Sequence, residues 1–194
     1  MIFNENRWHR SKVKTAWLEK AKTEAPKYEQ NHGHGTVAIR EDRETISIIG
    51  REKFREWAAE NSIVCTIGEF VDKQFGDKND VLLGGFNCDI KTQIKDANQW
   101  YLSSGTVHIF ENQIGKEMDV YIFAGWEKAN GDAVLFGWCT RAYFLRYCYK
   151  IPEGTMLGNF QTRWTSFNLE MKRLMPIADL SAENIEWMMK KMVQ

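Results

Sequence analysis

The sequence predicts an α/β fold, in which helices and strands share one hydrophobic core. Three patterns support this prediction. Apolar residues recur at helical spacing near both ends of the chain, two short apolar runs flank a Gly-Gly pair, and a dense apolar run spans residues 119–127. With 194 residues, the chain is long enough for one substantial core and not clearly long enough for two. We therefore expect residues 1–194 to form a single domain.

The segment before the Gly-Gly pair is predicted to be mainly helical. Its expected elements are a helix over residues 11–24, a Gly-rich loop over 31–35, a strand over 36–39 and helices over 52–60 and 67–75. Each helix is predicted from apolar residues that recur every three or four positions and thus share one face. These residues are Val13, Trp17 and Ala21 in the first helix, Phe54, Trp57 and Ala58 in the second, and Ile67, Phe70, Val71 and Phe75 in the third.

The Gly-Gly pair at Gly84 and Gly85 predicts a two-residue turn that closes a β-hairpin over residues 79–92. Counting outward from this turn places Asp80 directly opposite Asp89. Directly opposed residues have Cβ atoms about 5 Å apart, and like charges there destabilise the pair. Lys91 lies two residues beyond Asp89, so both side chains point to the same face. Two carboxylates and an ammonium group would form a poor core but are suited to binding a divalent cation.

The remainder of the chain is predicted to alternate between strands and helices. The expected elements are a mixed, mainly helical segment over 93–102, strands over 106–110, 119–127 and 133–140, a helix over 141–147, irregular or edge structure over 150–168, and a last helix that begins at Ser181. The strand over 119–127 is apolar enough to be buried on both faces. Asn130-Gly131 predicts the turn that joins it to the next strand.

Composition limits the classes of function. Lys and Arg number 26, as do Asp and Glu, so a generally basic nucleic-acid-binding surface is excluded, although a local one is not. Basic residues exceed acidic ones over residues 1–30 and 141–175, which is weak evidence for a binding groove. The four cysteines are too scattered for a CxxC metal site and are expected to be buried hydrophobic residues. The first ten residues are too polar for a signal peptide and no run is long enough to span a membrane, so we expect a cytoplasmic, non-membrane protein.

The pattern of Asp80 followed by Asp89-Ile90-Lys91 resembles the PD-(D/E)XK nuclease superfamily, which includes many restriction enzymes, resolvases and phage exonucleases. Gly68-Glu69 resembles the acidic position that often precedes the core hairpin. The segments that resemble small phage and bacterial members are residues 119–123, 136–140 and 169–180. Asn79 replaces the proline of the motif and Asp89 replaces the commoner glutamate, and both departures are usual in the superfamily.

The resemblance implies a restriction-endonuclease-like domain with a central mixed β-sheet flanked by helices. It covers about residues 60–180 and leaves residues 1–50 as an N-terminal extension of helix and strand. It also implies a Mg²⁺-dependent deoxyribonuclease, in which Mn²⁺ can replace Mg²⁺ and DNA is the partner. Because many members are dimers or tetramers, a homo-oligomer is allowed.

The resemblance also assigns roles to individual residues. Asp80, Asp89 and the backbone carbonyl of Ile90 would bind the cation, with Glu69 as a further ligand from the preceding helix. Lys91 would orient or deprotonate the attacking water, or stabilise the charge that develops on the phosphate; a lysine acts as a base only if burial or a nearby cation lowers its pKa. Hard cations held by carboxylates and phosphate oxygens are suited to phosphodiester hydrolysis. Gln93 would contact substrate, although it could equally be a polar residue at a strand end.

Other candidate residues are weaker. His32 and His34 could bind a metal, but in a Gly-rich loop they are expected to be flexible and exposed. His108 on a strand is expected to be a structural histidine and not a general base. Trp17, Trp57 and Trp138 are expected in the core, whereas Trp100, Tyr101 and Trp164 are the candidates for stacking on bases. No nucleophile elbow and no GxxxxGK[ST] loop is present. Two alternatives to a nuclease remain open, a non-catalytic module on the same fold that binds nucleic acid or protein, and a structural protein with incidental charges.

Overall fold

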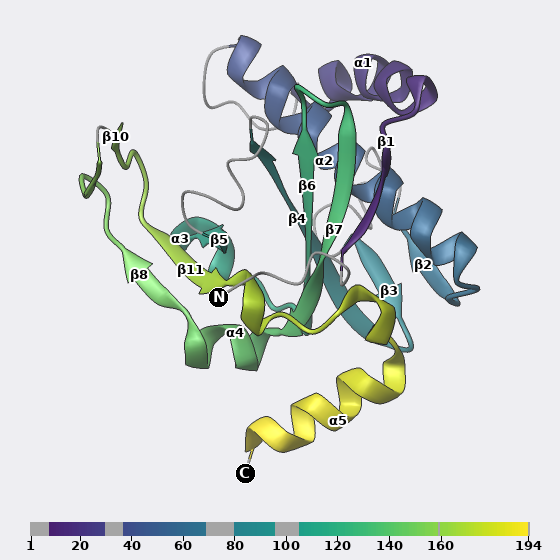
Figure 1. Cartoon of the computed structure of the whole chain (residues 1–194), viewed down its shortest axis with the longest axis vertical. Helices are drawn as coiled ribbons and strands as arrows, with labels where there is room; N and C mark the ends of the chain where they lie inside the picture. Colours follow the sequence, from purple (N-terminus) through teal and green to yellow (C-terminus); the bar gives the residue numbers. More distant parts are fainter. Residues whose placement is uncertain (1–7, 30–36, 69–79, 96–104, 159, 194) are drawn as a thin grey trace.

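The computed structural model describes residues 8–29, 37–68, 80–95, 105–158 and 160–193. It has a mixed α/β architecture, in which a curled, mixed six-stranded sheet is flanked by helices and accompanied by a smaller sheet (Figure 1). The coarse prediction of a mixed sheet flanked by helices is confirmed. The second sheet was not predicted as a separate unit.

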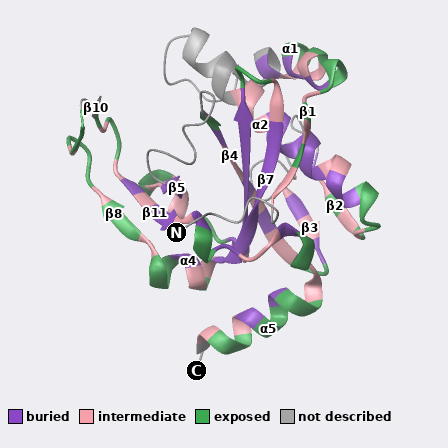
Figure 2. Ribbon diagram, in the orientation of Figure 1, coloured by how far each residue is buried: buried purple, intermediate pink, exposed green. Residues whose placement is uncertain are grey.

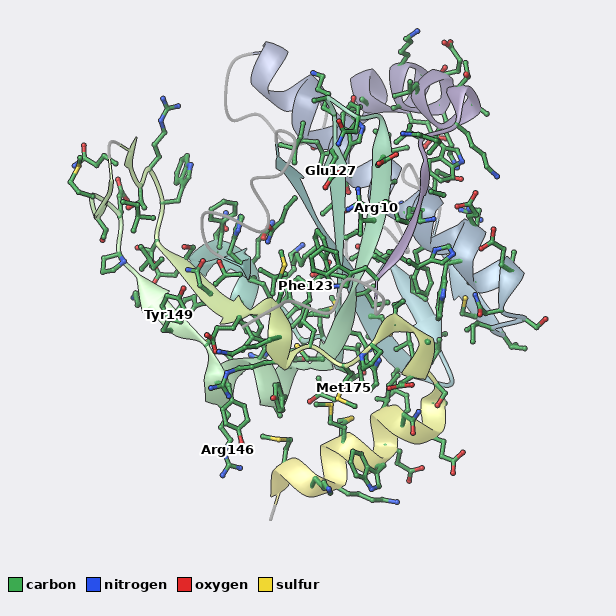
Figure 3. All side chains as sticks on the ribbon, viewed as in Figure 1. Arg10, Phe123, Glu127, Arg146, Tyr149 and Met175 are labelled. Atoms are coloured by element: carbon green, nitrogen blue, oxygen red, sulfur yellow. The ribbon has the colours of Figure 1, made fainter. Side chains whose placement is uncertain are left out.

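The central sheet has the strand order β1-β7-β6-β4-β3-β2. Its strands, in chain order, are β1 (His9–Lys12), β2 (Cys65–Ile67), β3 (Val81–Leu83), β4 (Phe86–Lys95), β6 (Val120–Glu127) and β7 (Asp132–Thr140). Strands β4 and β6 pair in parallel, and every other neighbouring pair is antiparallel. The edge strand β1 is tied to the sheet by Arg10, whose Nη1 lies 2.5 Å from Oε2 of the buried Glu127 on β6 (Figure 3).

The second sheet has three strands in the order β5-β11-β8 and lies beside the central sheet (Figure 1). Its strands are β5 (Thr106–Phe110), β8 (Tyr149–Ile151) and β11 (Ser166–Glu170), and a further short pair is formed by β9 (Met156–Leu157) and β10 (Phe160–Gln161). Residues 150–168 therefore contain edge strands, as predicted, but β11 begins within them and is the central strand of its sheet.

The α-helices are α1 (Thr15–Glu29), α2 (Val37–Glu60), α3 (Glu111–Ile114), α4 (Arg141–Tyr147) and α5 (Ala182–Val193), and the 3₁₀-helices are η3 (Met171–Arg173) and η4 (Ile177–Asp179). Helix α2 packs on β4, β6 and β7, and α1 packs on α2. Helix α4 begins where predicted, and its N-cap Thr140 accepts a hydrogen bond from the backbone of Tyr143. Helix α5 follows Ser181, whose hydroxyl accepts from Asn184 N.

The core lies on both faces of the central sheet, and β6 is buried along its whole length, as predicted (Figure 2). On one face, Ile90 and Ile122 pack with Phe54 and Trp57 of α2 and with residues of α5. On the opposite face, Phe123 and its neighbours pack against β5, β11 and α4. The second sheet therefore covers the face toward which the odd-numbered residues of β4 point, and this arrangement creates the site described below.

Three predicted elements before and after the hairpin are wrong where the structure describes them. Residues 37–39, predicted as strand, are the start of α2, so the helix predicted over 52–60 begins far earlier. Ile67, predicted to begin a helix, is the last residue of β2. Residues 93–95, predicted as helical, continue β4, because pairing with β6 extends to Lys95. In each case tertiary pairing or packing outweighs local preference. The structure does not describe residues 69–75 of the helix predicted over 67–75, or residues 96–102 of the segment predicted over 93–102. The predicted loop over 31–35 also lies outside the described residues.

The cysteines are free, with Cys88 and Cys139 buried and Cys65 and Cys148 half-buried. Burial as hydrophobic residues is therefore confirmed for two of the four. Within the ranges that the structure describes, no helix is long and apolar enough to cross a membrane.

Candidate metal centre in a cleft beside the hairpin

The hairpin has the predicted turn and register. Gly84 and Gly85 have φ values of 56° and 89°, as a type I′ turn requires at both central positions. Leu83 pairs with Phe86 and Val81 pairs with Cys88, and Asp80 and Asp89 directly follow this paired segment, one on each side of the hairpin. The N–H of Asp80 also donates to the carbonyl of Cys88 at 3.0 Å.

The carboxylate of Asp80 is held by two donors. Arg51 on α2 lies with Nη2 2.5 Å from Oδ1 of Asp80, and the backbone N–H of Ile90 donates to Oδ2 at 2.8 Å. Arg51 is 5% exposed, and its Nη1 donates to the carbonyl of Gly68 at 3.1 Å. An ionised carboxylate offers about four lone-pair positions, so two hydrogen bonds fix its orientation and leave acceptor capacity for a further ligand.

Asp89 and Lys91 form an ion pair on the same face of β4. The distance from Lys91 Nζ to Asp89 Oδ2 is 2.5 Å, and the two side chains are 12% and 14% exposed. Burial raises the pKa of Asp89, the charge of Lys91 opposes this effect, and the negative charge of Asp80 adds to it. The ionised form of Asp89 is therefore only partly compensated by its present neighbours, and a further positive charge beside it would be stabilising.

The backbone of Ile90 presents its carbonyl to the same side of β4 as Asp80. Its N–H points toward Asp80, and in a β-strand the N–H and C=O of one residue point to the same neighbouring strand. Strand β3 ends its pairing with β4 at Cys88, so beyond that residue this edge of β4 has no strand partner in the described ranges. The carbonyl of Ile90 thus lies on the side where a cation shared with Asp80 would bind.

These residues open onto a cleft of about 760 Å³ between α2 and β4 on one side and the β5–α3 segment and the β10–β11 connection on the other. Its lining residues are Glu44, Ile46, Ser47, Arg51, Asp80, Asp89, Ile90, Lys91, Thr92, Gln93, His108, Phe110, Glu111, Asn112, Gln113, Lys116, Glu153, Trp164 and Thr165. The structure therefore brings together five of the six predicted site residues. The sixth, Glu69, lies outside the described residues.

Gln93 has an unusual environment in this cleft. The residue is 5% exposed, and both its Oε1 and its Nε2 are buried without a hydrogen-bond partner in the described part of the chain. A buried polar group without a partner costs about 1–3 kcal/mol. Gln93 is thus not an exposed polar residue at a strand end, because β4 continues to Lys95.

The tryptophans divide as predicted where they are described. Trp17, Trp57 and Trp138 are buried, whereas Trp164 is 57% exposed at the cleft. Trp100 and Tyr101 lie outside the described residues, as do His32 and His34. His108 is half-buried, lines the cleft and contacts the ring of Phe110 at 5.1 Å between centroids.

Sequence reasoning missed Arg51, Glu44 and Lys116 as cleft residues. Arg51 directly precedes the helix that periodicity predicts over residues 52–60. A helix that begins at residue 52 gives no reason to place the Arg51 side chain near the hairpin. Lys116 follows α3, which the sequence analysis did not predict, and its charge acts on Asp89. No local pattern identifies these residues, because the packing of α2 and of the second sheet brings them to the cleft.

The donor set is compatible with a hard divalent cation. Among the described residues, no group of three or more His, Cys, Asp or Glu side chains is arranged to hold a metal ion. Mg²⁺, however, commonly binds through one or two carboxylates, with water and substrate phosphate as the other ligands. Asp80, Asp89 and the Ile90 carbonyl meet this lower requirement. The lining contains five carboxylates against three Lys and Arg side chains, and Lys150, outside the lining, pairs with one of the five, Glu111. The excess of negative charge that remains would be reduced by a cation.

Comparisons with protein-family models, with curated proteins and with solved structures give no significant match. The function must therefore be argued from the cleft itself.

Proposed function

We propose that this protein is a metal-dependent nuclease that hydrolyses DNA phosphodiester bonds on a restriction-endonuclease-like domain. Asp80, Asp89 and the carbonyl of Ile90 would hold Mg²⁺, or Mn²⁺ in its place, and Glu69 is a further candidate ligand. The observation that carries the proposal is the convergence of Asp80, Asp89 and Lys91 on one cleft beside the hairpin. The mixed sheet flanked by helices is compatible with that fold.

In the hydrolysis, a water oxygen forms a bond to phosphorus, the bond from phosphorus to the leaving oxygen breaks, and the proton lost by water is balanced by one gained at the leaving oxygen. The bound cation would neutralise charge on the phosphate and make the water more acidic. Arg51 holds Asp80 in one orientation, which pre-organises that carboxylate. Lys91, positioned by Asp89, would donate to a phosphate oxygen or to the attacking water.

The proposal is tested by cleavage of labelled DNA in linear, nicked, branched and single-stranded form, with RNA in parallel. Cleavage is expected in Mg²⁺ or Mn²⁺ and not with a chelator. Asp89→Asn and Lys91→Met should each lower kcat/KM about a hundredfold or more, because each removes a group that acts directly in the reaction. The matched control is Asp179→Asn, an exposed carboxylate in η4 outside the cleft, which should retain full activity.

Activity that persists in folded Asp89→Asn or Lys91→Met protein would exclude this site. Absence of cleavage on every substrate would exclude the proposed activity.

One observation favours a second candidate function, a non-catalytic module that binds nucleic acid or protein. Arg51 and Lys91 already form ion pairs with Asp80 and Asp89, so each of the two carboxylates has a positively charged partner without a metal. The two functions differ in their response to cations. A metal centre predicts thermal stabilisation by Mg²⁺ that is lost in Asp89→Asn, whereas a purely binding cleft predicts none.

A further inference from the structure

The buried amide of Gln93 is a hydrogen-bonding group for which the described protein provides no partner. In native proteins nearly all buried polar groups have a hydrogen-bond partner. A buried polar group in a cleft without such a partner suggests that a bound ligand supplies the missing hydrogen bonds. Both the donor and the acceptor of this amide are unpartnered. The missing partner must therefore offer an acceptor and a donor side by side.

The position of Gln93 relates this requirement to the candidate metal centre. Asp89, Lys91 and Gln93 alternate along β4 and line the same cleft. Two residues along a strand span roughly 6–7 Å, which is comparable to the separation between a phosphate and the base of a neighbouring nucleotide. A phosphate at Asp89 and Lys91 would thus leave a base within reach of Gln93.

Trp164 supplies a second group in the cleft that could contact a base. Its side chain is 57% exposed in the segment before β11, at the opposite side of the cleft from β4. Stacking of an aromatic ring on a base contributes about 1–3 kcal/mol and requires an accessible ring face. The cleft therefore offers an aromatic surface and a base-edge partner within one volume of about 760 Å³.

We propose that Gln93 and Trp164 form a subsite for one unpaired DNA base, preferably adenine, next to the phosphate bound by the candidate metal centre. This inference rests on the proposed nuclease function. The base must be unpaired, because its edge has to enter the cleft and displace the groups that cover the Gln93 amide, whose two polar atoms are buried in this structure. Adenine offers an N–H donor beside a nitrogen acceptor on two edges, N6–H with N7 and N6–H with N1, whereas unpaired cytosine and thymine each offer such a pair on one edge only, and a glutamine amide pairs with both atoms.

The inference is tested by equilibrium binding of short single-stranded oligonucleotides in Ca²⁺, so that affinity is measured without relying on cleavage. The strands are oligo(dA), oligo(dT), oligo(dC) and an abasic strand of equal length. The wild-type protein should prefer oligo(dA). Gln93→Leu should lose this preference, with about a tenfold or greater loss of affinity for oligo(dA) and little change for the abasic strand.

Trp164→Ala should weaken binding of every strand that carries bases, again by about tenfold, and leave the abasic strand unaffected. The matched control is Trp187→Ala, because Trp187 is also half-exposed but lies on α5 outside the cleft. It should bind all strands as the wild type does. Equal losses on an RNA strand of the same sequence would also support the subsite, since Gln93 would contact the base and not the sugar.

Thermal unfolding separates a ligand-binding role from a structural one. Replacing an unpartnered buried amide by an apolar side chain of similar volume should leave the melting temperature of Gln93→Leu unchanged or higher. A clear decrease would mean that the amide is satisfied within the protein and would overturn the proposal. Unchanged base preference in Gln93→Leu would overturn it as well.

The two proposals can fail separately. If the wild type cleaves DNA but Gln93→Leu keeps its base preference, the subsite is wrong and the nuclease function stands. If no substrate is cleaved but Gln93→Leu loses the base preference of the wild type, the subsite proposal is supported and the protein binds DNA without cleaving it.

Discussion

At the scale of single residues, the cleft is organised by charged groups that lie where charge is costly. Arg51 is buried, and the side chains of Asp80, Asp89 and Lys91 are each at most 14% exposed. Removing one member of such an ion pair leaves the charge of the other member uncompensated. Each member therefore helps to hold its partner's side chain in place. Arg51 acts as a positioning residue for Asp80, because it fixes one carboxylate oxygen while Ile90 N–H fixes the other.

A second buried charge cluster joins β1 to α2 and has a measurable dependence on pH. Glu56 accepts hydrogen bonds from Ser11 and Lys53, with Lys53 fully buried, and its other oxygen lies 2.8 Å from Lys14 Nζ. Burial raises the pKa of Glu56, but Lys14, Lys53 and Ser11 outweigh this effect and lower the pKa to about 2. The ionised carboxylate is therefore favoured by the folded state.

We predict that Glu56→Gln lowers the free energy of unfolding at pH 7 by on the order of 1–3 kcal/mol. Because the folded-state pKa lies below the ordinary value of 4.5, the contribution of Glu56 is complete above about pH 4.5 and is lost as the pH falls toward 2. Urea unfolding at several pH values should show the two proteins converging in acid. Glu19→Gln, at an exposed ion pair with Lys22, should behave as wild type throughout. A difference that does not depend on pH would contradict the assignment.

At the scale of elements, the site depends on the packing of α2 against β4. A Cβ atom added at Gly50 would lie 1.8 Å from Oγ1 of Thr92, so the helix and the strand approach more closely than any other residue would permit. Arg51 directly follows Gly50, and Lys91 directly precedes Thr92. This contact therefore sets the distance between the helix that supplies Arg51 and the strand that supplies Asp89 and Lys91.

The same contact explains where sequence reasoning failed. Residues 46–50 contain three isoleucines and end in glycine, a composition that disfavours a helix, so periodicity predicted one only from residue 52. The hairpin, in contrast, was predictable in register, because Gly-Gly allows few turns and a register shift by one would reverse every side chain. Local patterns could thus locate Asp80, Asp89, Lys91 and Gln93. They could not locate Arg51 or Lys116, which reach the cleft only through tertiary packing.

We predict that Gly50→Ala destabilises the protein although alanine is the better helix former. Overlap with the stiff side chain of Thr92 should cost about 1–3 kcal/mol, against about 1 kcal/mol gained in helix propensity. Thr92→Ala in the same chain should restore part of the loss, since it removes Oγ1 and Cγ2, and urea unfolding of the four proteins measures the coupling. Gly115→Ala, where no atom lies within 4 Å of the added Cβ, should be tolerated. Full additivity of the two substitutions would refute the close contact.

At the scale of the whole molecule, the second sheet converts one face of the central sheet into a cleft. It covers Phe123 and its neighbours but leaves the end of β4 open, where Asp89, Lys91 and Gln93 line the volume. Sequence patterns predicted the strand of residues 106–110 but not its partners in a separate sheet. The pairing of β5 with β11 joins residues about sixty positions apart, and no local pattern specifies such a contact.

The charge of the assembled cleft leads to a last prediction, that divalent cations are required for tight DNA binding. With five carboxylates against three cationic side chains in the lining and Lys150 beside Glu111, the metal-free cleft keeps a negative excess and should repel a phosphate backbone. One Mg²⁺ or Ca²⁺ would more than offset this excess. Saturation to one hundred times Kd should stabilise the fold by about 2.7 kcal/mol, or roughly 5–10 °C for a chain of this size.

Asp80→Asn combined with Asp89→Asn provides the decisive comparison, because it removes both negative charges without supplying a metal site. In a chelator, this variant should bind single-stranded DNA more tightly than the wild type does, since less negative charge faces the phosphates. In Ca²⁺ the order should reverse, because only the wild type gains the cation, and its melting temperature alone should rise. Fluorescence anisotropy in both buffers measures the two affinities. If the affinities keep the same order in both buffers, the carboxylates do not act on DNA through a bound cation.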